Sequence, residues 1–389
     1  MRFALTAERV FDGHGMRNGC AVIVDAARIA DVVELSELDR SIPVRDLGDG
    51  ILSPGFNDLQ VNGGAGVLFN ATPTVAAVKA IAAAHRAFGV TGLLPTVITD
   101  SPEVMVAAVT AVSEAIRLRV PGVLGIHIEG PFIDPKRKGA HDERFIRTPT
   151  EQDLKWLCGL DCGKVVLTLA PNMVAPATIR RLAEAGIIVS LGHSDATAEE
   201  AMTAIENGAR CFTHLFNAMS QMTGRSPGMV GAAFETQERT GCSLIADGHH
   251  VDRLALRAAI RAKPFGGAFY VSDAMPSAAC GPNHFELQGR RVEVVDGRLQ
   301  LSDGTLAGAN ITMRDAVIFG IGKLGLSIEE SLRMATFYPA LIIDGMIELG
   351  NLAAGYRANL VHLSDDLDVL ETWIDGVSSS SGEIPATVA

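Results

Sequence analysis

Short apolar runs rich in valine, isoleucine and leucine recur through the middle of the chain, and each is followed by a glycine, proline or polar break. Short runs bounded by turn signals are typical of strands that are buried on both faces of a sheet. The pattern predicts eight such strands, near Gly55–Val61, Gly92–Ile98, Val123–Ile128, Val165–Leu169, Ile187–Leu191, Arg210–Leu215, Cys242–Ala246 and Ala268–Ser272.

Segments with helical spacing lie between these strands. Pro102 and Pro176 each stand where a helix would begin, which suits proline because its missing N–H is not needed in the first turn. Thr197 and Glu200 have the spacing of a capping box. The predicted helices include Thr74–Phe88, Pro102–Arg119, Thr150–Leu157, Pro176–Ala185, Thr197–Asn207 and Asp252–Ala262.

The alternation of strands and helices predicts an α/β fold with a parallel sheet that is covered on both faces. Eight strands are the number that closes into a (β/α)8 TIM-type barrel. The alternative is an open, doubly wound sheet, which would place a glycine-rich phosphate turn after its first strand. The candidate turn, Asn62-Gly63-Gly64-Ala65-Gly66, lacks the spacing of a dinucleotide-binding motif, and this favours the barrel.

The two ends of the chain have a different pattern. Strand-like alternation occurs at Cys20–Val24, Arg28–Val33, Asn359–Leu363 and Val369–Ile374. Neither end is long enough to form a stable β domain by itself. We therefore predict a small β-sandwich domain formed from both termini, residues 1–52 plus 356–389, with the barrel at residues 53–355 inserted between them. The serine-rich end, Ser378–Ala389, is predicted to be a frayed tail.

Composition limits the class of protein. The 389 residues are 48% hydrophobic and 20% charged, which is a globular composition, and the net charge of −12 argues against nucleic acid as the main partner. No run of 18 uninterrupted apolar residues occurs, and the first residues lack the apolar core of a secretory signal. With six scattered cysteines, these features predict a cytoplasmic protein that has reduced thiols and no membrane partner.

Polar residues with metal-binding or acid–base chemistry follow several predicted strands. Catalytic groups of (β/α)8 barrels lie at this carboxyl end, so residues far apart in the sequence would meet there. Two imidazoles and one carboxylate are a common ligand set for a catalytic divalent metal, and we assign this role to Glu129, His193 and His214. Asp273, after the eighth strand, is suited to act as the general base and acid.

Eight short motifs, in order along nearly the whole chain, carry a resemblance to a known family. They are Pro54–Gly63, His127–Phe132, Lys138–His141, Leu191–Ser194, Thr213–Met219, Gly224–Gly228, Asp247–Asp252 and Gly304–Gly308. In this ordered set the sequence resembles the N-acetylglucosamine-6-phosphate deacetylases of the amidohydrolase superfamily. The resemblance implies metal-dependent hydrolysis of N-acetyl-D-glucosamine 6-phosphate to D-glucosamine 6-phosphate and acetate. It also implies a barrel with a small β-sandwich domain, usually in a homodimer.

Matched position by position, the resemblance implies the same three metal ligands and the same catalytic aspartate, and it places His141 beside the reacting acetyl group as a second catalytic residue. Arg225 matches an arginine that reaches the phosphate of the neighbouring subunit's substrate. Taken alone, Arg225 is equally compatible with a solvated loop charge and His250 with a helix cap. The residues expected around the substrate are Gln60, Ala140, His141, Asn217, Ala218, Arg225, His250, Leu306, Ala307 and Gly308. A sugar phosphate needs such cations and N–H donors.

The number of metal ions is predicted from the first strand. Many relatives in the superfamily carry a His-x-His pair there and hold two metals, whereas this chain has Gln60-Val61-Asn62. Amide side chains are weak ligands for zinc, and the resemblance associates a Gln-x-Asn form with one metal. We therefore expect one divalent ion, Zn²⁺, with Fe²⁺ or another divalent metal as the alternative.

Two segments depart from the family pattern. Asn172 stands where relatives often have glutamate, and the stretch Met275–Cys280 after the catalytic aspartate is unusual. Both lie near predicted strand ends, so they bear on substrate preference rather than on the reaction type. Gly63–Gly66 and Lys136–Lys138 are candidates for a loop that closes over the site.

Three rival functions stay open at this point. The first is a deacetylase of a related amino-sugar phosphate, such as N-acetylgalactosamine 6-phosphate. The second is a cyclic-amide hydrolase of the same superfamily, but the bridging lysine expected after the fourth strand is missing from Leu169-Ala170-Pro171-Asn172. The third is a non-catalytic sugar-phosphate-binding barrel, which would have no need to keep the four catalytic side chains.

Overall fold

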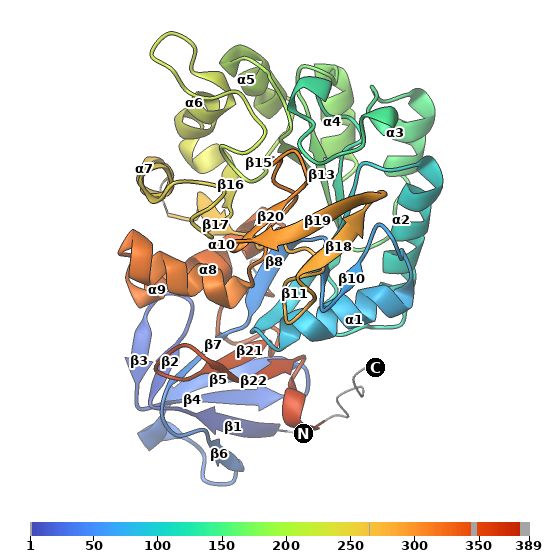
Figure 1. The fold of residues 1–389 in the computed structure, drawn as a ribbon. Coiled ribbons are helices and arrows are strands. Elements are labelled where there is room, and N and C mark those ends of the chain that lie inside the picture. Colours follow the sequence, from blue (N-terminus) through green and yellow to red (C-terminus); the bar gives the residue numbers. More distant parts are fainter. Residues whose placement is uncertain (1, 264, 344–347, 382–389) are drawn as a thin grey trace.

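A computed structural model describes residues 2–263, 265–343 and 348–381 and contains the predicted barrel (Figure 1). Eight parallel strands form one sheet in the order β17-β16-β15-β14-β13-β12-β11-β8. Their bounds are β8 Phe56–Val61, β11 Val90–Ile98, β12 Gly125–Glu129, β13 Lys164–Leu169, β14 Ile188–Leu191, β15 Cys211–Phe212, β16 Gly241–Leu244 and β17 Ala268–Tyr270. All eight predicted strands are present, and the α/β barrel prediction is confirmed.

The sheet closes through contacts between its first and last strands. Val61 forms an isolated parallel bridge with Ala274, and the backbone N–H groups of Asn62 and Gly63 both donate to the carbonyl of Ala274 at 2.9 Å. Below this bridge, the buried carboxylate of Asp58 accepts from the hydroxyl and the backbone N–H of Ser272. These bonds bring the ends of β8 and β17 side by side, which places residues 60–62 next to Asp273.

Helices cover the outside of the barrel (Figure 1). Their bounds are α1 Val75–Arg86, α2 Pro102–Arg117, α3 Glu151–Leu157, α4 Pro176–Glu184, α5 Ala198–Glu206, α6 Gly228–Glu235, α7 Arg253–Ala262, α8 Met313–Phe319, α9 Ile328–Ala335 and α10 Phe337–Ile342. The capping box of Thr197 and Glu200 is present, and Thr150 with Asp153 forms another. None of the helices in the described part of the chain has the length and apolar character that crossing a bilayer requires.

The small domain lies below the barrel in Figure 1 and is built from both ends of the chain. One sheet has the order β5-β4-β1-β6 and the other the order β23-β22-β21-β7-β2-β3. Their bounds are β1 Arg2–Thr6, β2 Arg9–Phe11, β3 Met16–Asn18, β4 Cys20–Asp25, β5 Arg28–Glu34, β6 Val44–Asp46, β7 Ile51–Pro54, β21 Leu360–Leu363, β22 Val369–Ile374 and β23 Val377–Ser378. The buried Trp373, Leu360 and Leu5 belong to the core between the sheets.

The predicted domain limits stay a prediction, but the structure shows where the chain changes sheets. β7 pairs with β21 in the small domain, and β8 starts the barrel after only one intervening residue, Gly55. Of the predicted tail, Ser379–Ser381 form a short 3₁₀ helix, and residues 382–389 lie outside the described residues.

A three-stranded antiparallel sheet was not predicted. It comprises β18 His284–Leu287, β19 Arg290–Val295 and β20 Arg298–Gln300, inserted between β17 and α8. Two-residue turns join its strands, and all four turn residues, Gln288-Gly289 and Asp296-Gly297, have positive φ. A smaller hairpin, β9 Gly63–Gly64 with β10 Val67–Leu68, follows β8.

Candidate active site and metal centre

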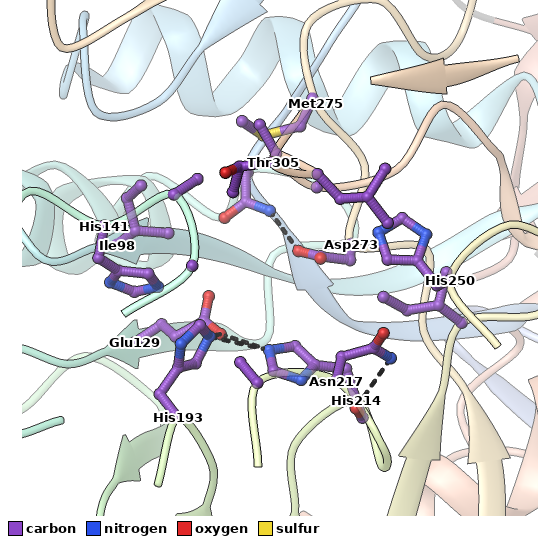
Figure 2. A pocket seen from close by; sticks show the side chains of 18 of the residues that line it. Ile98, Glu129, His141, His193, His214, Asn217, His250, Asp273, Met275 and Thr305 are labelled. Atoms are coloured by element: carbon purple, nitrogen blue, oxygen red, sulfur yellow. Dashed lines mark hydrogen bonds and ion pairs between the residues drawn. The ribbon is translucent and has the colours of Figure 1, made fainter. Parts of the chain in front are cut away.

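A cavity of about 400 Å³ opens at the carboxyl ends of the barrel strands (Figure 2). Its lining combines residues from loops that are far apart in the sequence, and it includes Glu129, His193, His214 and Asp273. Of the predicted substrate-binding residues, it brings together Ala140, His141, Asn217, Ala218, His250, Leu306, Ala307 and Gly308. The carboxyl end of the barrel is thus where the candidate chemistry converges, as the barrel prediction requires.

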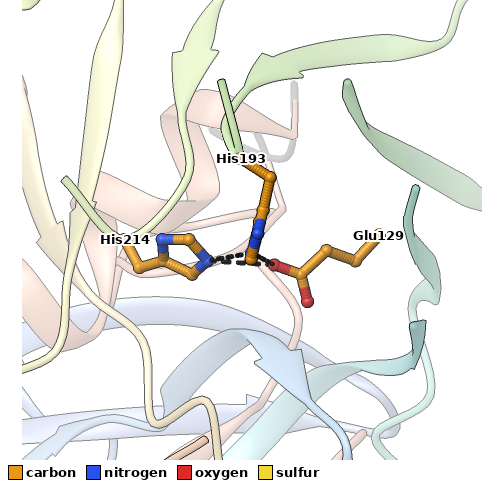
Figure 3. A group of neighbouring side chains, drawn as sticks. All are labelled: Glu129, His193 and His214. Atoms are coloured by element: carbon orange, nitrogen blue, oxygen red, sulfur yellow. Dashed lines mark hydrogen bonds and ion pairs between the residues drawn. The ribbon is translucent and has the colours of Figure 1, made fainter. Parts of the chain in front are cut away.

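The three candidate metal ligands meet at one point, as shown in Figure 3. Oε1 of Glu129 lies 3.0 Å from Nε2 of His214 and 3.2 Å from Nε2 of His193. The two Nε2 atoms are 3.1 Å apart. Glu129 ends β12, His193 follows β14 and His214 follows β15, so three neighbouring regions of the barrel each contribute one ligand.

This triangle fits a divalent cation. Nitrogen and oxygen ligands lie ~2.0–2.2 Å from zinc, so two of them at tetrahedral or octahedral angles are separated by ~3–3.5 Å. Nδ1 of His193 lies 2.8 Å from the carbonyl oxygen of Arg137. Because a carbonyl only accepts, Nδ1 carries the hydrogen and the lone pair of Nε2 is free to bind a metal.

The charge state of the triangle also suits a cation. Although burial opposes ionisation of Glu129, the close imidazoles of His193 and His214 hold its pKa well below the usual range. Burial likewise opposes protonation of His214, but the hydrogen bond and negative charge of Glu129 raise its pKa. A buried carboxylate surrounded by imidazoles therefore supplies the negative charge that a metal ion would neutralise.

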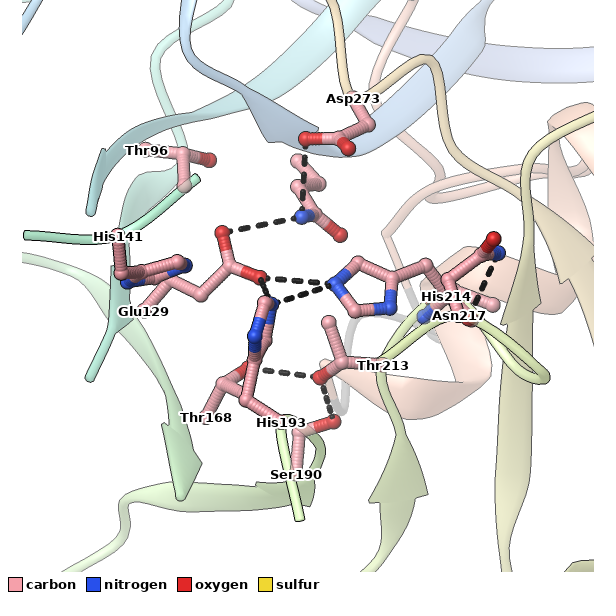
Figure 4. A network of polar contacts seen from close by, with 12 residues as sticks. Thr96, Glu129, His141, Thr168, Ser190, His193, Thr213, His214, Asn217 and Asp273 are labelled. Carbon is pink, nitrogen blue, oxygen red and sulfur yellow. Dashed lines mark hydrogen bonds and ion pairs between the residues drawn. The ribbon is translucent and has the colours of Figure 1, made fainter. Parts of the chain in front are cut away.

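Asp273 faces the triangle from the opposite side of the barrel mouth (Figure 4). Its Oδ1 accepts from Nδ2 of Asn62 at 2.6 Å and from Nε2 of Gln60 at 3.0 Å. Burial, together with the negative charge of Glu129, raises the pKa of Asp273 to about 6. Both amides hold the same oxygen, so Oδ2 is the carboxylate oxygen that remains for a reactant.

Gln60 stands between the two carboxylates. Its Nε2 donates to Oε2 of Glu129 at 3.2 Å as well as to Asp273. Carboxylates accept only, so this contact fixes which end of the amide faces them. Gln60 is almost fully buried, beside the ligand triangle rather than in the lining of the cavity.

The backbone at three of these residues is left-handed. His193, His214 and Asp273 have φ values of 46°, 33° and 48°. Residues other than glycine rarely adopt this conformation, and such strain concentrates at functional sites. One or two residues separate each of them from the end of a barrel strand, so the turn lies where the side chain joins the site.

His141 is held as a hydrogen-bond donor. Its Nδ1 lies 3.3 Å from the backbone nitrogen of Thr99 and 2.8 Å from the Thr99 hydroxyl. Because a backbone N–H can only donate, Nδ1 accepts and the ring hydrogen is on Nε2. Burial, with the neighbouring His193, lowers the pKa of His141 to about 3, so the ring is neutral.

A polar layer beneath the ligands was missed by the sequence analysis. Nδ1 of His127 lies 3.1 Å from the carbonyl of Leu59, and its Nε2 lies 2.7 Å from the hydroxyl of Thr168. Thr168 contacts Thr213 at 2.7 Å, and Thr213 contacts Ser190 at 2.6 Å. The signal was present, because His127 and Thr213 belong to the motifs that contain Glu129 and His214.

The other missed residue is Asp247. It accepts from the backbone N–H groups of His249 and His250 and lies 2.6 Å from Nδ1 of His250. This contact places the hydrogen on Nδ1 of His250 and leaves its Nε2 for another partner. His250 therefore has a fixed partner at one side of the cavity.

Arg225 is not brought to the cavity by the single chain. It lies in an exposed loop at residues 221–227 and does not contribute to the cavity lining. Asn172, one of the two departures, donates to Oδ2 of Asp134 at 2.6 Å and accepts from the hydroxyl of Ser194 at 2.7 Å, which supports the loop next to His193. Met275, from the other departure, lines the cavity.

Both loops that were candidates for closing over the site contact the site region. Lys136 and Arg137 line the cavity, and the segment at Gly63–Gly66 bonds to the chain after Asp273 through Ala65 N–H to Ala278 at 3.0 Å and Gly66 N–H to Pro276 at 2.8 Å.

The chain is similar to known proteins over most of its length. Residues 51–378 match the model of the amidohydrolase family, and residues 2–52 match the NagA composite domain. The chain is 44% identical to N-acetylgalactosamine-6-phosphate deacetylase of Shewanella sp. strain ANA-3, over 85% of this chain and 83% of that protein. It is 38% identical to human N-acetylglucosamine-6-phosphate deacetylase, over 91% of this chain and 90% of that protein.

Comparison with solved structures finds proteins of the same kind. The crystal structure of N-acetylglucosamine-6-phosphate deacetylase from Pasteurella multocida superposes with a TM-score of 0.93 at 34% identity, covering 97% of this chain and 99% of that one. The likeness therefore extends through both the barrel and the small domain.

Proposed function

The chain belongs to the amidohydrolase family, and on that premise we propose that it hydrolyses the acetamide of N-acetyl-D-glucosamine 6-phosphate to D-glucosamine 6-phosphate and acetate. The observation that carries this proposal is the meeting of Glu129, His193 and His214 with Asp273 in one cavity. Relatives that share the fold over nearly the full chain are named for this reaction.

We propose that Glu129, His193 and His214 hold one divalent cation, Zn²⁺. When bound, such an ion lowers the pKa of a coordinated water and polarises a carbonyl oxygen. Support for a single ion comes from Gln60, whose Nε2 donates to both Glu129 and Asp273. These N–H groups stand between the two carboxylates, where a second cation would otherwise bridge them.

Asp273 is proposed to move the proton. The amides of Asn62 and Gln60 fix Oδ1, so Oδ2 takes a proton from the attacking water. As the amide C–N bond breaks, Asp273 returns this proton to the leaving amine. His141 donates its Nε2–H to the acetyl oxygen, where negative charge develops. Its neutral state and fixed tautomer suit this role and exclude it from proton transfer.

The sugar phosphate is proposed to lie toward Asn217, Ala218, His250 and the Leu306–Gly308 stretch, with Ala140 nearer the acetamide. Gln60 lies behind the lining and is proposed to act through the carboxylates of Glu129 and Asp273. We further propose a homodimer in which Arg225 reaches the phosphate of the partner's substrate. Its position in an exposed loop, away from the cavity of its own chain, supports that arrangement. All six cysteines are unpaired thiols, which supports a cytoplasmic location.

A second candidate substrate is N-acetyl-D-galactosamine 6-phosphate. The observation that favours it is the 44% identity to the Shewanella enzyme named for that epimer. The reaction and the proposed residue roles are the same for both epimers, because they differ only at a sugar hydroxyl.

Acetate release from the two epimers, with and without a chelator, tests both proposals. We expect chelator-sensitive hydrolysis of the gluco substrate with the larger kcat/KM. A larger kcat/KM for the galacto epimer would instead identify N-acetyl-D-galactosamine 6-phosphate as the preferred substrate. No acetate from either substrate in the metal-loaded enzyme would overturn the deacetylase proposal.

A further inference from the structure

One side of the cavity is an apolar wall that the proposed mechanism does not use. The wall consists of Ile98, Ala140, Met275 and Leu287, all of which line the cavity. They belong to a hydrophobic cluster that is separate from the main barrel core and is completed by residues of the three-stranded insertion. Leu287 is fully buried, and Ile98 and Met275 are nearly so.

The insertion fixes Leu287 at this position. Leu287 is the last residue of β18, and the turn that follows it is tied to the barrel loops. Nε2 of Gln288 donates to the carbonyl of Thr99 at 2.7 Å and to Oδ2 of Asp100 at 3.0 Å. Arg290 donates to the carbonyl of Ala140. The wall is therefore anchored to the two loops that carry Thr99 and His141.

Ile98, one member of the wall, and the polar end of the cavity lie on opposite sides of the reacting groups. In Figure 2, Ile98 lies beside His141, across the cavity from His250 and Asn217. A secondary amide is planar and trans, so the acyl carbon chain and the sugar carbon lie on opposite sides of its C–N bond. A sugar that extends toward His250 then directs the acyl chain toward Ile98 and Leu287.

On the basis of the proposed function, we infer that Ile98 and Leu287 limit the acyl group to acetyl. The acetyl methyl group would face this wall, and each further methylene would press against side chains that are packed in a buried cluster. Overpacking of this kind is resisted because the turn of the insertion is held by its hydrogen bonds to the barrel. The three-stranded insertion is thus a specificity element for the N-acyl group.

The test compares N-acetyl-, N-propanoyl- and N-butanoylglucosamine 6-phosphate with the zinc-loaded enzyme. We expect kcat/KM to fall with each added methylene, by about 10-fold or more. Leu287→Ala removes part of the wall, and the butanoyl-to-acetyl ratio of kcat/KM should rise by about 10-fold or more. The ratio is used because it does not depend on how much of the variant is folded.

Leu299→Ala is the matched control. Leu299 is fully buried in the same cluster but does not line the cavity, so its loss should lower the melting temperature and leave the ratio unchanged. Ile98→Val is a milder second variant if Leu287→Ala does not fold, and it should raise the propanoyl-to-acetyl ratio.

The inference would be overturned if the wild-type enzyme releases acetate and both variants, Leu287→Ala and Ile98→Val, keep the wild-type ratios of kcat/KM. The deacetylase proposal would then stay intact. Wild-type enzyme that releases no acetate would remove the proposed function, and the inference with it.

Discussion

Nδ2 of Asn62 lies 2.6 Å from Oδ1 of Asp273, so the residue that follows the first barrel strand positions the carboxylate that follows the last. The contact exists because β8 and β17 meet at the closure of the barrel, where Val61 bridges to Ala274. The contacts that close the barrel therefore also orient Asp273, the proposed base.

Asp273→Asn should lose ~10²–10⁴-fold in kcat, because the amide can neither accept nor return the proton. The metal ligands and the sugar-binding residues are unchanged, so zinc content and substrate binding should stay near wild type. Acetate release and elemental analysis measure the two properties. Near-normal turnover in this variant would remove Asp273 from the proton-transfer role.

The wild-type chain should bind one tightly held divalent ion, and replacing both Gln60 and Asn62 by histidine should raise the number to two. Imidazoles at these positions would offer lone pairs between Glu129 and Asp273, where amide N–H groups now lie. Elemental analysis after extensive dialysis gives the stoichiometry. Two ions in the wild-type chain would contradict the single-site proposal.

His141→Ala should lower kcat by ~10²–10³-fold, the usual cost of losing one donor to a developing oxyanion. His141→Gln retains an N–H donor at a similar reach and should recover part of the loss. Steady-state kinetics of both variants, with metal content as the control, separate the donor role from a structural one. Equal loss in the two variants would argue against the donor role.

Arg225→Ala should raise KM for the phosphorylated substrate by about 10- to 100-fold, because a charge-assisted contact is lost. Mixing Arg225→Ala chains with Asp273→Asn chains gives a sharper result. In a mixed dimer, the chain with an intact Asp273 receives Arg225 from its partner, so activity at low substrate should recover. Two affinity tags would verify that the purified dimers are mixed. If their activity at low substrate does not recover, Arg225 acts in the site of its own chain or in no site.

Asp153 should make stability fall in acid. Although burial works against it, hydrogen bonds from Arg147 at 2.5 and 2.6 Å and from Thr150 lower the pKa of Asp153 to about 2. Since the folded pKa is below the unfolded value of ~3.9, the stabilisation is complete above pH ~4 and is lost as pH falls from ~4 to ~2.

Arg147 is 39% exposed, and solvent screening reduces the contribution to ~1 kcal/mol. Melting temperatures of wild type and Asp153→Asn should therefore differ at pH 7 and converge as the pH falls to ~2. A difference that is independent of pH would show that the ion pair is not its source.

The barrel could be predicted because each strand is a short apolar run with a clear break after it, and the structure confirms all eight. The three-stranded insertion was missed although its second turn, Asp296-Gly297, is a strong hairpin signal between apolar alternations. Its strands are short and half exposed, so their hydrophobic pattern is weak.

For the site, the sequence predicted which side chains follow the barrel strands. It also predicted the fold that brings these side chains together. It could not predict the tautomers of His141 and His193, which depend on backbone partners at Thr99 and Arg137. It also could not place Gln60 between two carboxylates, because that contact depends on how β8 closes against β17.

The pairing of β7 with β21 has a consequence during synthesis of the chain. β7 lies at residues 51–54 and its antiparallel neighbour at residues 360–363, so the whole barrel must leave the ribosome before the two can meet. Until then the nascent chain presents β7 as an open strand edge, a site where other chains can add. The long-range pairing thus delays completion of the small domain until the whole barrel has been synthesised.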